Sequence, residues 1–319
     1  MLLSRFVVST ISIGLMVLGA GAVSAQDFPT KPIRIITGGV GGGNDFTARQ
    51  LAQGITGSLG QPVIVDNRTG FLATEAVSKA PPDGYTLIVI GNALWVRPLL
   101  EKVPHDVRDF SPITLTERTV NIVAVHPSLP VKSIKELIAL AKARPGELNY
   151  GSSAPGSSNH LAGELFRSMA GVKLVNVPYK SSPPVITALI GGEVQLAIID
   201  VGLVVPHVKT GKLRALAVTS TEPSALAPGL PTVAASGLPG YESVSMVGVL
   251  APTKTPAAII NRLNQEMVRV LNMPEVKERF LNVGIEVATS SPEQFAATIK
   301  SDIAKWGKVI KDAGISGAR

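Results

Sequence analysis

Two loops rich in small residues carry most of the groups in this chain that could bind a ligand. The first runs from Thr37 to Asp45 and reads TGGVGGGND, between an apolar run and a segment with helical periodicity. Glycine lets the backbone approach a ligand closely, and the unpaired N–H groups and positive dipole end of a helix start attract an anion. Asn44 stands where a dinucleotide fingerprint needs its third glycine, and no Gly-Lys-Ser/Thr of a phosphate-binding loop follows. The loop predicts an anion site made of backbone groups, with a plain tight turn as the alternative.

The second loop has the same placement and a different composition. It runs from Gly151 to His160 and reads GSSAPGSSNH, again between a predicted strand and a predicted helix. Ser157 or Ser158 can cap that helix, and the remaining hydroxyl and N–H groups can bind carboxylate oxygens. A loop that only caps the helix is the alternative interpretation.

A single acid follows a third apolar run. Asp200 comes directly after the predicted strand end at Leu196 to Ile199. Ligands of open α/β sheets bind beyond the carboxyl ends of strands, which makes Asp200 a candidate contact. The alternative is that Asp200 caps a helix starting at Val201.

Enzyme chemistry finds little support in the residue inventory. The chain has no cysteine, which excludes disulfides, thiolate metal sites and cysteine nucleophiles. Its histidines lack metal-binding spacing, and no Gly-x-Ser-x-Gly elbow occurs; they are His105, His126, His160 and His207. His160 beside the serine-rich loop could imitate a Ser–His dyad, which leaves a periplasmic hydrolase as a distant alternative. We therefore predict a binding protein without a metal or cofactor.

The elements that must position these loops alternate along the chain. Strands are expected at 33–36, 62–65, 85–90, 122–125, 148–150, 175–178, 194–199, 213–219 and 246–251. Helices are expected at 45–57, 73–80, 133–142, 159–169, 184–190, 256–272 and 292–313. Asn44 is the expected N-cap of the first helix, and Ser133 with Glu136 forms a capping box. Strand–helix alternation of this kind predicts an α/β fold with mostly parallel sheets and right-handed crossovers.

Composition limits the class of protein. Hydrophobic residues make up 45% and charged residues 17% of 319 residues, which suits two domains with large cores. Aromatic residues are only 4% and the basic residues are scattered, so nucleic acid is not an expected partner. Residues 1–25 have a basic start, an apolar stretch and small residues before Gln26. They predict a secretory signal peptide and a periplasmic protein, with a single membrane anchor as the alternative.

Several segments of the chain resemble the Bug/TctC family, the extracytoplasmic receptors of tripartite tricarboxylate transporters. The resemblance covers essentially all of the mature chain. The segments that carry it are FPTKPIR at 28–34, DFTAR at 45–49, GQPV at 60–63, APPDGYTL at 80–87, RDF at 108–110, HLAGELF at 160–166, VPYK at 177–180, GKLRALAVT at 211–219 and LPTV at 230–233.

The resemblance implies a two-lobed, periplasmic-binding-protein-like fold of type II, the Venus flytrap, with a mostly parallel sheet and flanking helices in each lobe. Lobe one would comprise 26–124 and 220–319, and lobe two 125–219, with hinges near 121–125 and 219–221. The two loops would act as pincers on a small carboxylated solute. A monomer would then deliver that solute to TctA/TctB-like membrane subunits or, alternatively, present its bound form to a sensor.

The chain departs from the family pattern at the pocket, so the identity of the solute does not transfer. The first loop lacks the usual prolines and aromatic residue, Ser181 replaces a glycine, and the family's aspartate falls on Ile199, one place before Asp200. The residues predicted to bind the solute are Gly38, Gly39, Gly41, Gly42, Gly43, Asn44, Asp45, Asn92, Ser152, Ser153, Gly156, Ser157, Ser158, Ser181 and Asp200.

Overall fold

The computed structural model describes residues 28–68, 70–153, 157–312 and 314. The predicted signal peptide and the candidate site residue Gly156 lie outside the described residues. No helix in the described part of the chain is both long and apolar enough to cross a bilayer.

The first part of the chain alternates strands and helices as the sequence predicts. Its elements are β1 (Ile33–Thr37), α1 (Gly43–Leu59), β2 (Val63–Asn67), α2 (Phe71–Ser78), β3 (Thr86–Gly91) and the short α3 (Ala93–Val96). β1 lies between β2 and β3 and is parallel to both. Because the strands are parallel, the loops that follow them emerge at one edge of the sheet.

One long strand joins the two halves of the molecule. After the 3₁₀ turns η1 (Arg97–Leu99) and η2 (Val107–Asp109), β4 (Phe110–Val125) runs for 16 residues. Its first half pairs with β9 (Val244–Pro252) and its second half with β7 (Leu196–Asp200), both antiparallel. The sequence predicted only 122–125, because the first half carries Pro112, charged residues and two shifts of register that break the alternation of apolar residues.

The second half again alternates strands and helices, which are arranged around β7. Its strands are β5 (Asn149–Ser152), β6 (Val175–Pro178), β7 and β8 (Arg214–Val218), and its helices are α4 (Ile134–Ala143), α5 (Ser158–Ala170), α6 (Ser182–Ile190) and α7 (Val201–Lys209). β5 is parallel to β6 and to β7, whereas β4 runs antiparallel to β7 and β8. The carboxyl ends of β5, β6 and β7 therefore share an edge as well.

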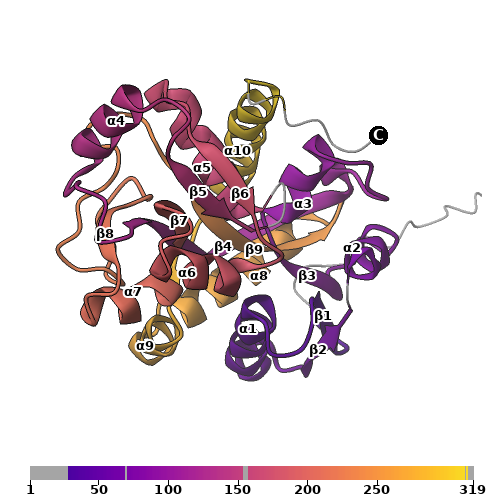
Figure 1. The fold of residues 1–319 in the computed structure, drawn as a ribbon. Coiled ribbons are helices and arrows are strands. Elements are labelled where there is room, and N and C mark those ends of the chain that lie inside the picture. The colour runs from indigo at the N-terminus through magenta and orange to yellow at the C-terminus, as the bar shows by residue number, and fades with distance from the viewer. Residues whose placement is uncertain (1–27, 69, 154–156, 313, 315–319) are drawn as a thin grey trace, which may run out of the picture.

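The last part of the chain returns to the first half. It contains β9, α8 (Ala257–Leu271), α9 (Pro274–Asn282), β10 (Glu286–Val287) and α10 (Pro292–Asp312), and α10 packs against α5 (Figure 1). The strand order is β2-β1-β3-β9-β4-β7-β5-β6, with β8 and β10 also paired to β4. The α/β prediction is confirmed, and the sheet is mixed because β4 and β9 run against their neighbours.

Two apolar clusters fill the interior. One lies between the sheet of the first half and the helices α1 and α8, and contains Ile33, Leu51 and Leu263. The other is larger and continues through both halves, from α10 to α5. The predicted core stripe of α10 is confirmed, since Phe295, Ile299, Trp306 and Ile310 are buried and Ile303 packs against them.

Candidate ligand-binding site

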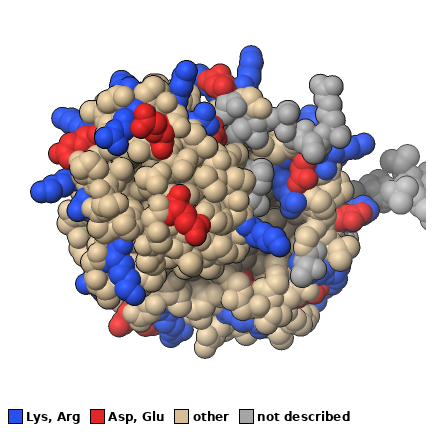
Figure 2. All heavy atoms as spheres, in the orientation of Figure 1, with Lys and Arg blue, Asp and Glu red and all other residues tan. Residues whose placement is uncertain are grey.

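Both small-residue loops lie at carboxyl ends of parallel strands, where α/β proteins bind ligands. A Cβ on Gly43, at the start of α1, would lie 4.0 Å from Ile285 Cδ1. A Cβ on the neighbouring Gly284 would lie 3.9 Å from the Cα of Gly202, at the start of α7. Residues 284–285 therefore connect the edge that carries the first loop with the edge of the second half. Figure 2 shows a hollow in this face, between α6 and the start of α1, with mostly uncharged walls.

The first loop presents backbone amides at the start of α1. Gly42 is the N-cap, with its N–H on the carbonyl of Gly39 at 3.3 Å and its carbonyl accepting from Phe46. The prediction that Asn44 caps the helix is wrong, because the helix begins at Gly43 and glycine fits the extended N-cap. In the described part of the chain, no protein acceptor meets the amides of residues 43–45. They are three unpaired donors at the positive end of a 17-residue helix.

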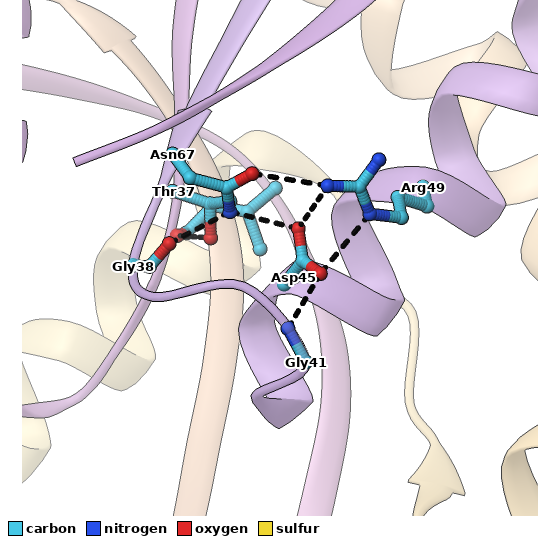
Figure 3. A network of polar contacts seen from close by, with 7 residues as sticks. Thr37, Gly38, Gly41, Asp45, Arg49 and Asn67 are labelled. Atoms are coloured by element: carbon cyan, nitrogen blue, oxygen red, sulfur yellow. Dashed lines mark hydrogen bonds and ion pairs between the residues drawn. The ribbon is translucent and has the colours of Figure 1, made fainter. Parts of the chain in front are cut away.

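A polar brace holds this loop in shape (Figure 3). The Asp45 carboxylate accepts from the Gly41 amide at 2.9 Å, from Arg49 Nε at 3.0 Å and from Asn67 Nδ2 at 2.8 Å. Asn67 Nδ2 also donates to the carbonyl of Gly38 at 2.8 Å. The hydrogen bond from Arg49, with those from Asn67 and Gly41, lowers the pKa of Asp45 to about 2.

The brace changes the role of one predicted site residue. Asp45 is 3% exposed and its side chain is fully engaged within the protein, so only its backbone amide remains as a donor for a solute. Sequence reasoning missed Arg49 and Asn67, although Arg49 stands four residues after Asp45, the spacing of a helical ion pair.

The glycines of the loop face open space. A Cβ placed on Gly38, Gly39 or Gly41 would meet no other atom within 4 Å. Gly41 has φ of +79°, so glycine is needed there for conformation. Val40 at the tip is 78% exposed. The structure thus leaves room in front of the α1 amides for a ligand.

The second loop turns most of its hydroxyls toward the protein. Ser157 is the N-cap of α5, as predicted, and accepts from the amide of His160 at 3.3 Å. The hydroxyls of Ser153 and Ser157 lie 2.5 and 2.6 Å from Asn159 Oδ1. Ser152 is fully buried and donates to Asn176 Oδ1 at 2.7 Å. Of the predicted serines here, Ser152 and Ser153 are both buried.

Asn159, which was not among the predicted site residues, connects this loop to the next two helix starts. Its Nδ2 donates to the Ser182 hydroxyl at 3.2 Å, and that hydroxyl lies 3.5 Å from Asp200 Oδ2. Asp200 ends β7 and precedes α7, yet its side chain makes no cap hydrogen bond. Burial raises its pKa above the ordinary value for an aspartate. The exposed Ser181 is the N-cap of α6 and also makes no side-chain cap bond.

Two further predictions concern Asn92 and His160. Asn92 follows β3, beside β1, and its backbone amide donates to the carbonyl of Met246 at 2.8 Å.

The Ser157 hydroxyl is engaged with Asn159 and with the His160 backbone, which is not the arrangement of a Ser–His dyad. Burial lowers the pKa of His160. The described residues contain no group of three acidic or histidine side chains that could hold a metal ion.

Comparison with known proteins agrees with this architecture. A family model described as the tripartite tricarboxylate transporter family receptor, TctC, matches residues 47–315. The chain belongs to this receptor family. Protein BugT of Bordetella pertussis is 34% identical over 313 residues, which cover 95% of this chain and 96% of BugT. Members and structural neighbours are solute-binding receptors, so the chain is a receptor and not an enzyme.

Two solved TctC-like structures show the same fold. Rpa4515 of R. palustris with adipate is 36% identical, with a TM-score of 0.72, covering 91% of this chain and 99% of that one. A TctC solute-binding protein from Polaromonas without ligand is 25% identical, with a TM-score of 0.83, covering 89% and 99%. The receptor thus has a periplasmic-binding-protein fold, and it superposes better on the ligand-free relative despite the lower identity.

Proposed function

We propose that this receptor captures a small carboxylate-containing solute between its two small-residue loops and passes it to a tripartite tricarboxylate-type transporter. Export through a signal peptide at residues 1–25 would place the receptor in the periplasm. The resemblance to Rpa4515, which was solved with adipate, supports a carboxylate ligand.

The observation that carries the proposal is the set of unpaired amides at residues 43–45. A helix start of this kind attracts an anion through its N–H groups and through a dipole equivalent to about half a positive charge. The nearby Asp45 carboxylate would repel a ligand anion, but it is held by Arg49 at 3.0 Å. Because Arg49 compensates the charge of Asp45, the dipole of α1 would dominate the electrostatic field at the loop.

The second loop would complete the site when the halves approach each other. Ser158, Ser181 and Asp200 lie at the starts of α5, α6 and α7. The better match to the ligand-free Polaromonas structure supports the interpretation that this structure is an open form. In that form a solute would first meet the α1 amides and would gain its remaining contacts on closure.

Substituting Gly42 by aspartate tests the site from within. Gly42 has φ of −78° and ψ of 167°, which any residue adopts, and a Cβ there would lie 3.4 Å from its nearest neighbour, Gly39 O. An aspartate N-cap accepts from the second and third helical amides, so its carboxylate would occupy the proposed anion site. We expect Gly42→Asp to keep or slightly raise stability, by a few tenths of a kcal/mol, while carboxylate affinity falls at least about a hundredfold.

The matched control is Gly42→Ala, which adds a Cβ without an acceptor. Isothermal titration calorimetry with a panel of mono- and dicarboxylates, beginning with adipate, gives the affinities, and thermal unfolding gives the stabilities. Equal carboxylate affinity in the Asp and Ala variants would show that the α1 amides do not bind the solute.

A further inference from the structure

The Asp200 carboxylate is only weakly held within the described protein. Asp200 precedes α7 without capping it, and its carboxylate accepts from its own backbone N–H and from the Ser182 hydroxyl at 3.5 Å, the long limit of a hydrogen bond. No lysine, arginine or histidine in the described part of the chain forms an ion pair with it. Asp45, across the site, is by contrast saturated by an arginine, an amide side chain and a backbone N–H.

Asp200 is half-buried, and partial burial makes an acid without a cation costly. A carboxylate removed from water without a cation or strong donors is destabilised, and burial accordingly raises the pKa of Asp200. Proteins keep buried charges where they are paired or where they bind something. The Asp200 carboxylate is therefore a group that would gain from a donor brought by a ligand.

A second unpartnered polar group lies next to Asp200. Asn121 on β4 faces Asp200 on β7 in the antiparallel register, which places both side chains on the same side of the sheet. Asn121 is 1% exposed, and neither its Oδ1 nor its Nδ2 has a hydrogen-bond partner among the described residues. Its backbone is fixed by Thr219, which donates to the Asn121 carbonyl and accepts from its amide. A buried carboxamide without partners is destabilising, and this unmet acceptor and unmet donor adjoin Asp200.

The position of Asp200 relative to the α1 amides suits a small molecule. Gly284 approaches Gly202, two residues after Asp200, and the next residue, Ile285, approaches Gly43. Asp200 is also joined through Ser182 and Asn159 to the second loop. Residues 284–285 thus lie between the starts of α1 and α7, and on closure of the halves one solute would reach the anion-binding amides with one end and Asp200 with the other.

We infer that Asp200 makes this receptor selective for solutes that carry an N–H donor, an ammonium or carboxamide group, in addition to a carboxylate. The inference rests on the proposed function, because it assigns the carboxylate to the α1 amides. A simple dicarboxylate would bring its second negative charge toward an acid that no cation neutralises. An ammonium or amide N–H would instead form a charge-assisted hydrogen bond with Asp200. Asn121 then acts as a positioning residue that keeps the surroundings of the acid polar.

Two matched pairs of probes test the inference in calorimetry with the full mature receptor. L-aspartate is compared with malate, which carries a hydroxyl in place of the ammonium, and 6-aminohexanoate is compared with adipate, which carries a carboxylate in place of the aminomethyl group. A hydrogen bond to a charged group corresponds to roughly tenfold to a hundredfold in affinity. We expect the wild-type receptor to favour at least one nitrogen-bearing probe by that factor, and Asp200→Asn to reduce the preference to within about threefold.

The control is Glu147→Gln, which removes one exposed acid from the same half of the molecule, before the amino end of β5 and away from the site. Glu147→Gln should leave the preference for nitrogen-bearing probes unchanged. If Asp200→Asn fails to fold, Asp200→Ser takes its place. Two outcomes overturn the inference and leave the proposed function intact. One is that malate binds as tightly as L-aspartate and adipate as tightly as 6-aminohexanoate. The other is that the preference for the nitrogen-bearing probe survives in both Asp200 variants. Failure of all four probes to bind the wild-type receptor counts against carboxylate capture itself, and the inference falls with it.

Discussion

Three acids near the site show how local surroundings decide what a carboxyl group does. Asp45 receives three kinds of donor and stays ionised, so it braces the first loop. Asp200 has no cation among the described residues and accepts only from its own backbone N–H and, at 3.5 Å, from Ser182, which suits it to a donor brought by a ligand. Glu117 on β4 is 3% exposed and accepts from the Thr47 hydroxyl of α1. Burial raises the pKa of Glu117 to about 7, which makes it a cost to the fold at neutral pH.

Glu117 should make stability fall as pH rises. Its pKa is 4.5 before burial and about 7 in the folded receptor, so the folded state holds the proton more tightly than the unfolded chain. The stabilising contribution is complete below pH 4.5 and is lost as pH rises through 7. A shift of this size corresponds to about 3 kcal/mol.

Glu117→Gln keeps an acceptor for Thr47 and removes the ionisation. We expect the variant to gain up to about 3 kcal/mol over the wild type at pH 8 and much less at pH 5. Urea unfolding at both pH values measures this difference. A gain of the same size at pH 5 and pH 8 would show that ionisation of Glu117 does not cost the fold.

At the scale of elements, α5 and α1 each carry a glycine whose surroundings differ. A Cβ on Gly163 in α5 would lie 2.3 Å from a ring carbon of Tyr150, whose hydroxyl is held by the buried Glu164. A Cβ on Gly57 in α1 would meet no atom within 4 Å. Gly163 thus allows α5 to lie close to β5, whereas Gly57 has no packing role among the described residues.

The same substitution should have opposite effects in the two helices. Gly163→Ala should destabilise the receptor by about 1–3 kcal/mol through overpacking and weaken binding, because α5 carries the second loop at its start. Gly57→Ala should stabilise it by about 0.5–1 kcal/mol through helix propensity. Thermal unfolding and calorimetry of both variants measure these effects. A stabilised Gly163→Ala variant would show that Tyr150 yields and that the close packing of α5 is not needed.

The sequence predicted elements well where pattern and local chemistry agree. The strands and helices at 33–90 were placed to within a few residues, because apolar runs, glycine turns and helical spacing coincide there. α9, which is short and polar, was not predicted, and α7, which contains Pro206, entered only as the alternative of a helix starting at Val201. The positions of both loops at strand ends were predicted, but the brace from Arg49 and Asn67 and the bridge through Asn159 depend on contacts between elements, which a linear pattern does not show.

At the scale of the whole molecule, β4 is the shared component of both halves. It pairs with β9 and β10 on one side of Asn121 and with β7 and β8 beyond it. Thr219 forms hydrogen bonds of 2.9 and 3.0 Å with Asn121, so the two segments in which the chain passes between the halves lie side by side. Paired crossings of this kind suit a hinge, since a change in a few backbone torsions there moves one half as a rigid body.

Closure about these crossings predicts that the receptor becomes more compact when it binds. The structure superposes better on a ligand-free relative than on one with adipate, although the latter is closer in sequence, which is the result expected if relatives of this fold close on binding. Small-angle X-ray scattering should show a smaller radius of gyration for the mature receptor saturated with a solute found by calorimetry. The Gly42→Asp variant should keep the larger value at the same solute concentration, because its own carboxylate occupies the α1 amides. An unchanged radius in a receptor that calorimetry shows to be saturated would mean that the two halves already have their bound arrangement, and that the solute enters without closure.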